Sequence, residues 1–501
     1  MTTSVNTNKG ILVIYTGGTI GSAPRDPDPD SPQIVVSWER LKKEMKEVKD
    51  LSDSFRIDAH SFSPPLDSCN IGPPEWKEMA RAIYDNYDNY EGFVILHGTD
   101  TMVYTASALS FILQDLGKPV VITGAQRSAM VDLRNDAGQN FVTAALLANP
   151  AFSGLPLVPE VVICFGGLIL RGNRSIKRDT SSYQAYYTPN LNPLGEAGNR
   201  IFIDEALIQP RPGPDRRFRL RPDLETNVMP IYVYPGIQDS EAVKRLLEMP
   251  GLRGVVIHAY GSGDIPTKAE FLSLFADARE RGVVSVVVTQ CKGGPVELGV
   301  YESSALLLEA GMIAGHDITS EAAQCKLMVL LGNKDMTQDE VEAEFQRDMA
   351  GEQSVSLWVT PFPGGTKTLQ GPAAKGEAPG TARLPARPLA GHWDPQRIAR
   401  ALLRLKGARV SAPKGEPARF RLFVNLGEGE APSNSHPGYA GQSRKESSDD
   451  SFMAFFDVTR AIKPIATPGE RVSFTFALDT LGASFSWESA ELALFIREVA
   501  E

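Results

Sequence analysis

Cysteine is scarce in this chain, with four in 501 residues. Cys69, Cys164, Cys291 and Cys325 show no CxxC spacing, so the sequence indicates neither a disulfide framework nor a zinc site. Cys164 falls within an apolar run that is typical of a buried strand. We therefore expect free, buried thiols in a protein of a reducing compartment.

Long apolar runs are also missing. The first ten residues, MTTSVNTNKG, lack the basic start and the apolar segment of an export signal. The apolar run at residues 11–15 is far too short to cross a membrane. These absences predict a cytoplasmic protein with no membrane partner.

The chain also lacks an excess of positive charge. It has 51 Lys and Arg and 61 Asp and Glu, which gives a formal net charge of -10. Neutralising phosphates requires clustered cations, so no nucleic acid partner is expected. The local exception is RPGPDRRFRLRPD at residues 211–223, with five arginines in its first eleven residues. We interpret it as a solvated linker between two domains, with a phosphate or RNA contact as the alternative.

What the chain does contain is a pair of threonine loops at the ends of apolar, β-branched runs. The first is ILVIYTGGTIG at residues 11–21, and the second is GFVILHGTDTMVYTA at residues 92–106. A third run leads into FGGLILRGNRSIKRDT at residues 165–180 and offers Lys177. A parallel α/β sheet places reactive groups in this way, at the carboxyl ends of its strands. Two threonines, an aspartate and a lysine there suggest a threonine-nucleophile amide hydrolase.

TGGTIG, HGTDT and RGNRSIK, in this order and at these separations, resemble the bacterial-type L-asparaginase family, and its cytoplasmic type I branch in particular. DSCN around Ser68, GAQRS at 124–128, YGSGDIP at 260–266 and TQC at 289–291 extend the resemblance over residues 9–332. The resemblance implies hydrolysis of L-asparagine to L-aspartate and ammonia. It also implies a homodimer or homotetramer that uses no metal and no organic cofactor.

The resemblance assigns the catalytic roles. Thr19 matches the family's nucleophile, and Thr99, Asp100 and Lys177 match the groups that move protons. A lysine can act as a base when burial favours its neutral form, and a nearby carboxylate opposes this. We therefore interpret Lys177 as a proton relay, with Thr99 either orienting the water or acting as a nucleophile in its own right.

Substrate contacts also follow from the resemblance. Ser68 matches the residue that binds the substrate α-carboxylate, and Asp100 also binds the α-ammonium group. Other matched positions supply backbone groups or a contact to a neighbouring subunit's site; they are Gly18, Gly98, Ala125, Gln126 and Asp264. His97 could be mistaken for a general base, but the resemblance assigns it no proton transfer and we expect a structural histidine.

Departures from the family pattern are as informative as the matches. The family's mobile loop carries a tyrosine that helps to deprotonate the nucleophile, yet residues 22–36 contain none. Asparagine turnover should then be low, unless a phenol from elsewhere replaces it, such as Tyr186, Tyr187 or Tyr301. Asp264 stands where the family usually has asparagine. At the type I regulatory site Cys291 fits, but His258 and Ile176 replace arginine and threonine, so we expect no allosteric control by asparagine.

The order of apolar runs and helical stretches predicts an α/β fold with two unequal domains of parallel or mixed sheets. We place the N-terminal asparaginase domain at residues 9–210 and the C-terminal asparaginase domain at 226–352. Six prolines and six glycines at residues 361–391 suggest an extended linker over 353–416, interrupted by a short helical stretch at 395–405 and crossed by few contacts. Alternating apolar residues then predict a small antiparallel β domain at 417–499, which the resemblance does not cover.

Two other functions compete with asparagine hydrolysis. One is the tRNA-dependent amidotransferase subunit that shares this fold, although that subunit usually carries an extra domain before its catalytic core. The other is a catalytically weakened asparaginase fold that binds an amino acid or a protein partner, for which the missing loop tyrosine is the motivation.

Overall fold

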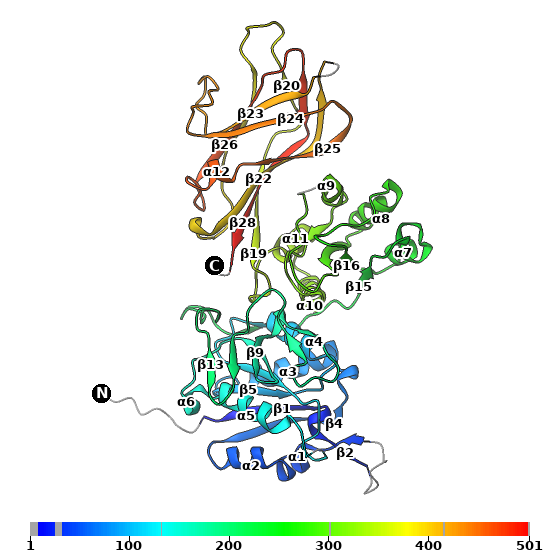
Figure 1. The fold of residues 1–501 in the computed structure, drawn as a ribbon, viewed down its shortest axis with the longest axis vertical. Helices are drawn as coiled ribbons and strands as arrows, with labels where there is room; N and C mark the ends of the chain where they lie inside the picture. Colours follow the sequence, from blue (N-terminus) through cyan, green and yellow to red (C-terminus); the bar gives the residue numbers. More distant parts are fainter. Residues whose placement is uncertain (1–8, 26–32, 132, 300–301, 414–415, 499–501) are drawn as a thin grey trace, which may run out of the picture.

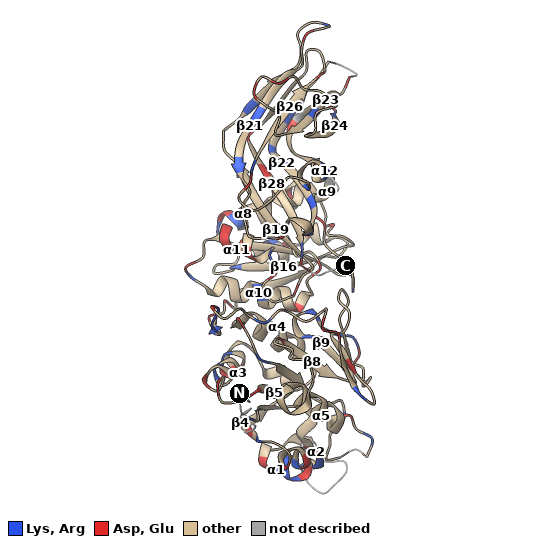
Figure 2. Cartoon of the chain, turned by 90° about the vertical axis from the view of Figure 1, so that its left-hand side faces the viewer, with Lys and Arg blue, Asp and Glu red and all other residues tan. Residues whose placement is uncertain are grey.

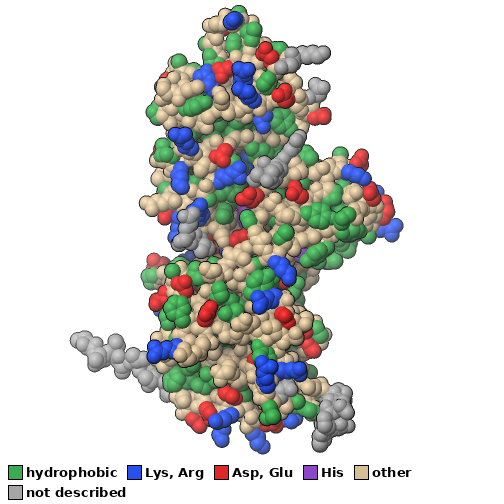
Figure 3. Space-filling model, in the orientation of Figure 1, with side chains coloured by type: hydrophobic (Ala, Val, Ile, Leu, Met, Phe, Trp, Pro, Cys, Tyr) green, Lys and Arg blue, Asp and Glu red, His purple; other side chains and the backbone are tan. Residues whose placement is uncertain are grey.

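The computed structural model describes residues 9–25, 33–131, 133–299, 302–413 and 416–498. Three bodies follow one another along the long axis of the molecule, and both Figure 1 and Figure 2 show them in the same order. The N-terminal α/β domain lies at one end, a smaller α/β domain in the middle, and a β sandwich at the other end. On the face shown in Figure 3, acidic and basic side chains are interspersed along the whole length.

A mixed sheet organises the N-terminal domain. The strands β1 (Ile11–Gly17), β4 (Ile57–Leu66), β5 (Gly92–Leu96), β7 (Val120–Thr123) and β8 (Val161–Phe165) are parallel, and β4 forms one edge of the sheet. The antiparallel strands β9 (Leu168–Arg171), β12 (Gly195–Ala197) and β13 (Ile201–Ile203) extend one side of the sheet. The order is β13-β12-β9-β8-β7-β5-β1-β4. This confirms the α/β fold with a mixed sheet.

Helices cover both faces of this sheet because β1 is apolar on both sides. Leu12 and Ile14 belong to the core beneath one face, whereas Ile11, Val13 and Tyr15 belong to the core beneath the other. The first face is covered by α3 (Pro73–Asp85) and α4 (Met102–Ile112). The opposite face is covered by α1 (Trp38–Glu44), α2 (Lys46–Ser52) and α5 (Ala137–Ala148), which α6 (Pro150–Ser153) follows.

Short pairs of strands complete the N-terminal domain. They are β2 (Ser22–Pro24) with β3 (Gln33–Val35), β10 (Ile176–Lys177) with β11 (Tyr186–Tyr187), and β6 (Leu113–Gln114) with β14 (Arg219–Leu220). The pair β6 and β14 brings the arginine-rich segment back onto the domain, and Arg216 and Arg219 both form ion pairs with Asp115. Part of that segment is therefore folded against the domain.

The middle domain is a parallel sheet with helices around it. Its strands are β15 (Val228–Tyr232), β16 (Gly254–Ala259), β17 (Val284–Thr289) and β18 (Ile313–Ala314), in that order. Its helices are α7 (Glu241–Leu247), α8 (Ala269–Glu280), α9 (Glu302–Glu309), α10 (Ser320–Gly332) and α11 (Gln338–Phe345).

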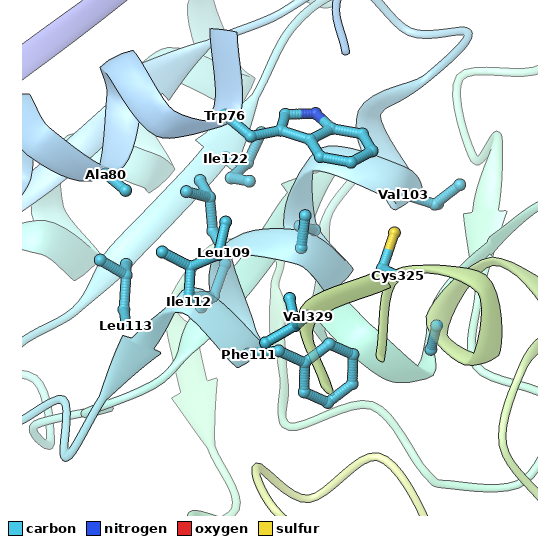
Figure 4. Close-up of a cluster of buried hydrophobic side chains, with 14 of the residues drawn as sticks. Trp76, Ala80, Val103, Leu109, Phe111, Ile112, Leu113, Ile122, Cys325 and Val329 are labelled. Atoms are coloured by element: carbon cyan, nitrogen blue, oxygen red, sulfur yellow. The ribbon is translucent and has the colours of Figure 1, made fainter. Parts of the chain in front are cut away.

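The two α/β domains share one hydrophobic core. Cys325 and Val329 of α10 face Leu109 and Ile112 of α4, as Figure 4 shows. These side chains are 0% exposed, and burying apolar groups of this size stabilises the contact by roughly 1.5–3 kcal/mol per side chain. The relative position of the two domains is therefore fixed by packing.

The C-terminal body is a sandwich of antiparallel sheets that begins at residue 355. One sheet contains β19 (Val355–Phe362), β20 (Lys367–Gln370), β22 (Ile398–Ser411), β25 (Ser448–Asp457), β27 (Ser484–Trp487) and β28 (Ser489–Arg497). The other contains β21 (Gly380–Pro388), β23 (Ala418–Val424), β24 (Tyr439–Lys445) and β26 (Arg471–Leu478). The helix α12 (Thr459–Ile462) packs against β22 and β24. The antiparallel β domain is thus present, and a single core joins its sheets.

The prediction of a linker over residues 353–416 is wrong, because β19 to β22 lie in this range. The glycines at 364, 376 and 391 have positive φ angles and connect the strands, so they mark turns within the sandwich. Pro361 lies in an edge strand, and Pro385 lies at a register shift in another edge strand, positions where a missing N–H is tolerated. The helix expected at 395–405 is also wrong, because β22 there pairs with β25, β27 and β28.

The sandwich is also not separated from the middle domain by a stretch with few contacts. Glu352 forms a buried ion pair with Lys326, and Ser354 donates to Asp317 from its backbone N–H and its hydroxyl. Arg347 stacks on the Trp358 ring at 4.0 Å. Residues 347–358 therefore join the two bodies.

All four cysteines lie in the described residues, and none of them forms a disulfide there. Cys164 and Cys325 are buried, but Cys69 and Cys291 are exposed, so the expectation of buried thiols is wrong for these two. Both exposed cysteines lie in loops that follow strands, β4 and β17 respectively. Over the described ranges, no helix combines the length and the apolar character that crossing a membrane requires.

Candidate active site

Neighbouring parallel strands end at one edge of the N-terminal sheet, and most of the predicted residues follow those ends. Thr19 follows β1, Ser68 follows β4, Thr99 and Asp100 follow β5, and Ala125 follows β7. Because β4, β1, β5 and β7 are adjacent in the sheet and parallel, these loops meet at the same edge.

Glycines allow the two threonine loops to touch. Gly18 has a φ of +83°, and a Cβ placed there would lie 2.5 Å from the Gly98 backbone. A Cβ on Gly98 would lie 2.6 Å from the Ser68 hydroxyl oxygen. Side chains cannot be accommodated at these distances, so glycine at both positions brings Thr19, Thr99 and Ser68 together.

Thr19 begins a short 3-10 turn (Thr19–Gly21) and is half-buried. Its carbonyl accepts a hydrogen bond from the Ser22 hydroxyl, at 2.9 Å. No residue of the described part of the chain forms a hydrogen bond with the Thr19 hydroxyl, which leaves that hydroxyl available to a substrate. Tyr15 lies beneath the turn, where a Cβ on Gly21 would collide with its phenol oxygen.

Lys177 joins the site from β10 and contacts the second threonine loop. Its Nζ donates to the Thr99 hydroxyl oxygen at 2.9 Å and to the Asp100 carboxylate at 2.7 Å. The Lys177 side chain is 15% exposed, whereas the Asp100 side chain is 68% exposed. The amine is therefore sheltered, and the carboxylate keeps an open side that a cationic group can approach.

Tyr186 supports this arrangement from the paired strand. It lies opposite Lys177 in the β10 and β11 ladder, and its hydroxyl donates to the Thr99 carbonyl. Burial raises the pKa of Tyr186, and the charge of Asp100 adds to this effect. A phenol that stays protonated and donates to Thr99 holds the loop in place but cannot serve as a base. Sequence reasoning offered Tyr186 as a replacement base and missed this positioning role.

Two other phenols, Tyr15 and Tyr187, have their own contacts within the described residues. Tyr15 donates its hydroxyl to the Val36 carbonyl at 2.7 Å, and burial raises its pKa. Tyr187 lies beside Arg178, whose guanidinium carbon is 5.7 Å from the ring centre. Tyr301 and residues 26–32 of the tyrosine-free loop lie outside the described residues.

Ser68 is almost fully buried, with 1% of its surface exposed. Its hydroxyl oxygen accepts from the Asp100 backbone N–H at 3.3 Å, and its carbonyl accepts from the Thr101 hydroxyl at 2.6 Å. The loop after β4 is thereby tied to the loop after β5, which orients Thr99 and Asp100.

The loop after β7 is held by residues that sequence reasoning did not name. The Asp136 carboxylate accepts from the backbone N–H groups of Gln126 and Arg127, each at 3.0 Å. Asn140, one turn later in α5, donates to the Gly124 carbonyl at 3.0 Å. Ala125 is 0% exposed between these anchors. The sequence signal that could have indicated these anchors is the i, i+4 spacing of Asp136 and Asn140 near the start of a helix.

His97 is buried, and its hydrogen bonds define its tautomer. Trp76 donates from its indole nitrogen to the Thr105 hydroxyl oxygen at 3.0 Å, so the Thr105 proton is directed to His97 Nε2, 2.9 Å away. The ring proton then lies on Nδ1 and is donated to the Gly98 carbonyl at 2.6 Å. Burial lowers the His97 pKa to about 4. With both nitrogens engaged inside the protein, these contacts favour a structural role.

Asp264 is not brought into this cluster. It lies in the turn after β16 of the middle domain, where its carboxylate accepts from the Ser303 hydroxyl at 3.0 Å. His258, at the proposed regulatory position, stacks on Tyr232 with ring centres 4.1 Å apart, and burial lowers its pKa to about 4. Neither residue contacts Thr19, Thr99 or Lys177 among the interactions of the described residues.

Most of both α/β domains is similar in sequence to known proteins. Residues 10–209 match the family model described as Asparaginase, N-terminal, and residues 227–345 match the Glutaminase/Asparaginase C-terminal domain. L-asparaginase 1 of Escherichia coli K12 is 36% identical over 346 residues, which cover 69% of this chain and 98% of that protein. A glutamyl-tRNA(Gln) amidotransferase subunit from Archaeoglobus fulgidus is 33% identical over 350 residues, which cover 68% of this chain and 79% of that protein.

A solved structure agrees with these sequence matches. The crystal structure of L-asparaginase I from Vibrio cholerae superposes with a TM-score of 0.61 and 36% identity, covering 69% of this chain and 99% of that one. The second family model ends at residue 345, before the β sandwich begins.

Proposed function

Because the chain belongs to the asparaginase family, we propose that it hydrolyses L-asparagine to L-aspartate and ammonia, with Thr19 as the nucleophile. The observation that carries this proposal is the position of Lys177, whose Nζ lies within hydrogen-bond distance of both Thr99 and Asp100. The contact between Gly18 and Gly98 brings that group to the loop that carries Thr19. A nucleophile and a proton relay thus share one edge of the sheet.

In the first half of the proposed reaction, the Thr19 oxygen attacks the side-chain amide carbon of asparagine. The Thr19 proton passes to the group formed by Thr99 and Lys177. When the tetrahedral intermediate collapses, the carbon–nitrogen bond breaks, the proton goes to the leaving nitrogen, and ammonia departs. An aspartyl ester of Thr19 remains.

In the second half, water attacks the ester carbon and gives its proton to the same relay. The Thr19 oxygen leaves, regains a proton, and L-aspartate is released. Backbone N–H groups at the strand ends are the donors suited to stabilise the oxyanion in both halves. The reaction requires no redox step and, as proposed, no metal or organic cofactor.

Substrate orientation follows from the charges around this group. Asp100 keeps an open carboxylate, 68% exposed, that can receive the α-ammonium group while it also holds Lys177. Ser68 offers its hydroxyl for the α-carboxylate, and the backbone at Gly18, Gly98 and Ala125 borders the space between the loops.

We further propose that the protein acts in the cytoplasm as a homodimer or homotetramer. The four free thiols fit a reducing compartment. Within its own chain Asp264 binds Ser303 of the middle domain, away from Lys177. Its proposed role is therefore at the site of a neighbouring subunit.

The test is the release of ammonia by the purified full-length chain, measured together with L-aspartate, with L-asparagine and L-glutamine as separate substrates. The proposal predicts that asparagine yields ammonia and aspartate in equal amounts, without a tRNA acceptor or a partner enzyme. Ammonia that appears only with a tRNA acceptor and a partner enzyme would instead support the amidotransferase function, which the similarity to the Archaeoglobus fulgidus protein favours. Asparagine binding by calorimetry without ammonia release would support the weakened binding module.

A further inference from the structure

A cavity of about 350 Å³ lies where the β sandwich meets the middle domain. Its walls come from β19, β22 and β28 on one side and from the segments around Val296 and His316 on the other. Leu308, Leu357 and Phe495 contribute apolar surface. A volume of this size falls at the lower end of the range for small-molecule sites, roughly 300–1,000 Å³.

Arg404 gives the cavity a buried positive charge that is only partly compensated. The residue is 6% exposed, and its Nε has no hydrogen-bond partner in the described part of the chain. Its acidic partner, Glu491, is 3.4 Å away and also forms an ion pair with Lys406 at 3.8 Å. One carboxylate is therefore shared between two cations. A buried guanidinium without a full partner is costly, and an anion in the cavity would relieve that cost.

Phe495 and His316 form a wall beside this charge. The Arg404 guanidinium carbon lies 5.7 Å from the Phe495 ring centre, and the His316 ring meets the Phe495 ring edge-on, with centres 6.2 Å apart. His316 has a φ of +52°, an uncommon conformation for a residue other than glycine. Its Nε2 is buried without a hydrogen-bond partner among the described residues. An apolar ring surface next to a cation suits a ligand with an apolar body and an anionic end.

The acids at the cavity do not cancel this charge. Asp317 is already paired with Arg174 at 2.7 Å and accepts from the Ser354 hydroxyl at 2.6 Å. Glu297 is exposed. Arg400, also on the cavity wall, forms a solvent-accessible ion pair with Asp457 at 3.4 Å. The buried charge that a ligand meets inside is therefore that of Arg404.

The walls are fixed before any ligand arrives. Asn190 donates to the Asp317 carbonyl at 2.9 Å and accepts from the Gly294 N–H at 2.8 Å, so the N-terminal domain holds two of the segments in place. Arg174 binds Asp317, Ser354 and the Gly351 carbonyl together. A preformed site loses less conformational entropy on binding than one that must be assembled.

We propose that this cavity is a binding site for a small organic carboxylate with an apolar body, and that Arg404 receives the carboxylate. The site is formed jointly by the asparaginase core and the sandwich, so it provides a role for a domain that the family models do not cover. The proposal goes beyond asparagine hydrolysis and does not depend on it.

Binding is tested by isothermal titration calorimetry on the full-length chain. The probes are 3-phenylpropionate and hexanoate, with 3-phenylpropionamide as the uncharged control for the first. The expected result is binding of at least one carboxylate, with the amide weaker by about tenfold or more, because a charge-assisted hydrogen bond is lost. Absence of heat from both carboxylates at millimolar concentration would overturn the proposal, and equal affinity of 3-phenylpropionate and its amide would overturn the role of Arg404.

Two variants locate the site. Arg404→Gln should weaken carboxylate binding about tenfold while leaving amide binding little changed. Ala399→Phe adds a ring on the cavity wall and should abolish binding of both probes, which keeps the test decisive if the Arg404 variant does not fold. Undiminished binding in a folded Ala399→Phe protein would place the ligand elsewhere and refute the assignment.

Discussion

Replacing His97 tests whether this histidine has a structural or a catalytic role. The structure also predicts how the effect of the replacement on the free energy of unfolding depends on pH. Burial lowers the His97 pKa from 6.5 to about 4. A difference of this size corresponds to about 3 kcal/mol of folding free energy. Between these two values the unfolded chain binds a proton that the folded chain does not. The contribution of the neutral ring is therefore complete above about pH 6.5, falls as the pH falls, and is fully lost below about pH 4.

The variant to compare is His97→Asn, which does not titrate and keeps a side-chain N–H that can reach the Gly98 carbonyl. The free energy of unfolding is measured by urea denaturation of both proteins at several pH values from about 7 to about 4. We expect the advantage of the wild type over the variant to shrink by about 3 kcal/mol across this range. His60→Asn, at a partly exposed position beside Glu78, is the matched control.

Activity provides the second readout on the same proteins. Loss of a general base slows a reaction by roughly two to four decades, whereas a structural replacement should leave turnover within about tenfold when the fold is intact. A stability difference that does not change with pH would refute the linkage. A folded variant that has lost three decades of activity would show that His97 transfers a proton.

Three further outcomes are expected. Lys177→Met should lower ammonia release by about three decades or more with the unfolding midpoint little changed, because the relay to Thr99 is removed; near-normal turnover would remove Lys177 from the mechanism. A chain ending at Gln353 should unfold at a lower temperature than the full chain, because it loses the contacts of Ser354 with Asp317 and of Trp358 with Arg347; an unchanged melting temperature would mean that these contacts contribute nothing. Initial rates against asparagine concentration should follow a hyperbola, since His258 is stacked on Tyr232; a sigmoidal curve would indicate a working regulatory site.

The strands and loops of the α/β domains could be predicted because their signals are local. The apolar, β-branched runs that stop at glycine are buried strands, so the placement of Thr19 and Thr99 after strand ends followed from these runs and the glycines that end them. The position of Lys177 in the site could not be inferred that way, because it depends on contacts with Thr99 and Asp100, which lie 78 and 77 residues away in the sequence. The tautomer of His97 likewise depends on Trp76 and Thr105, which lie on two different helices.

In the β sandwich, amino-acid composition led to a wrong prediction of secondary structure. Proline and glycine between residues 361 and 391 are compatible with an extended linker and equally with turns and edge strands, and only the pairing partners decide between them. Those partners, such as β28 for β19, lie more than one hundred residues away in the sequence. The apolar spacing of β22 fits a helix as well as a strand, and its burial within a sheet overrides the local preference.

The most direct test of the central claim is the rate of ammonia release from L-asparagine by Thr19→Ala and by Thr19→Ser. Each variant is compared with the wild type after its unfolding midpoint has been found to match that of the wild type. The account predicts that the alanine variant loses about three decades or more, because the attacking oxygen is gone, and that the serine variant, which keeps that oxygen, retains measurable turnover. An alanine variant that releases ammonia within about tenfold of the wild-type rate would contradict the assignment of Thr19 as the nucleophile.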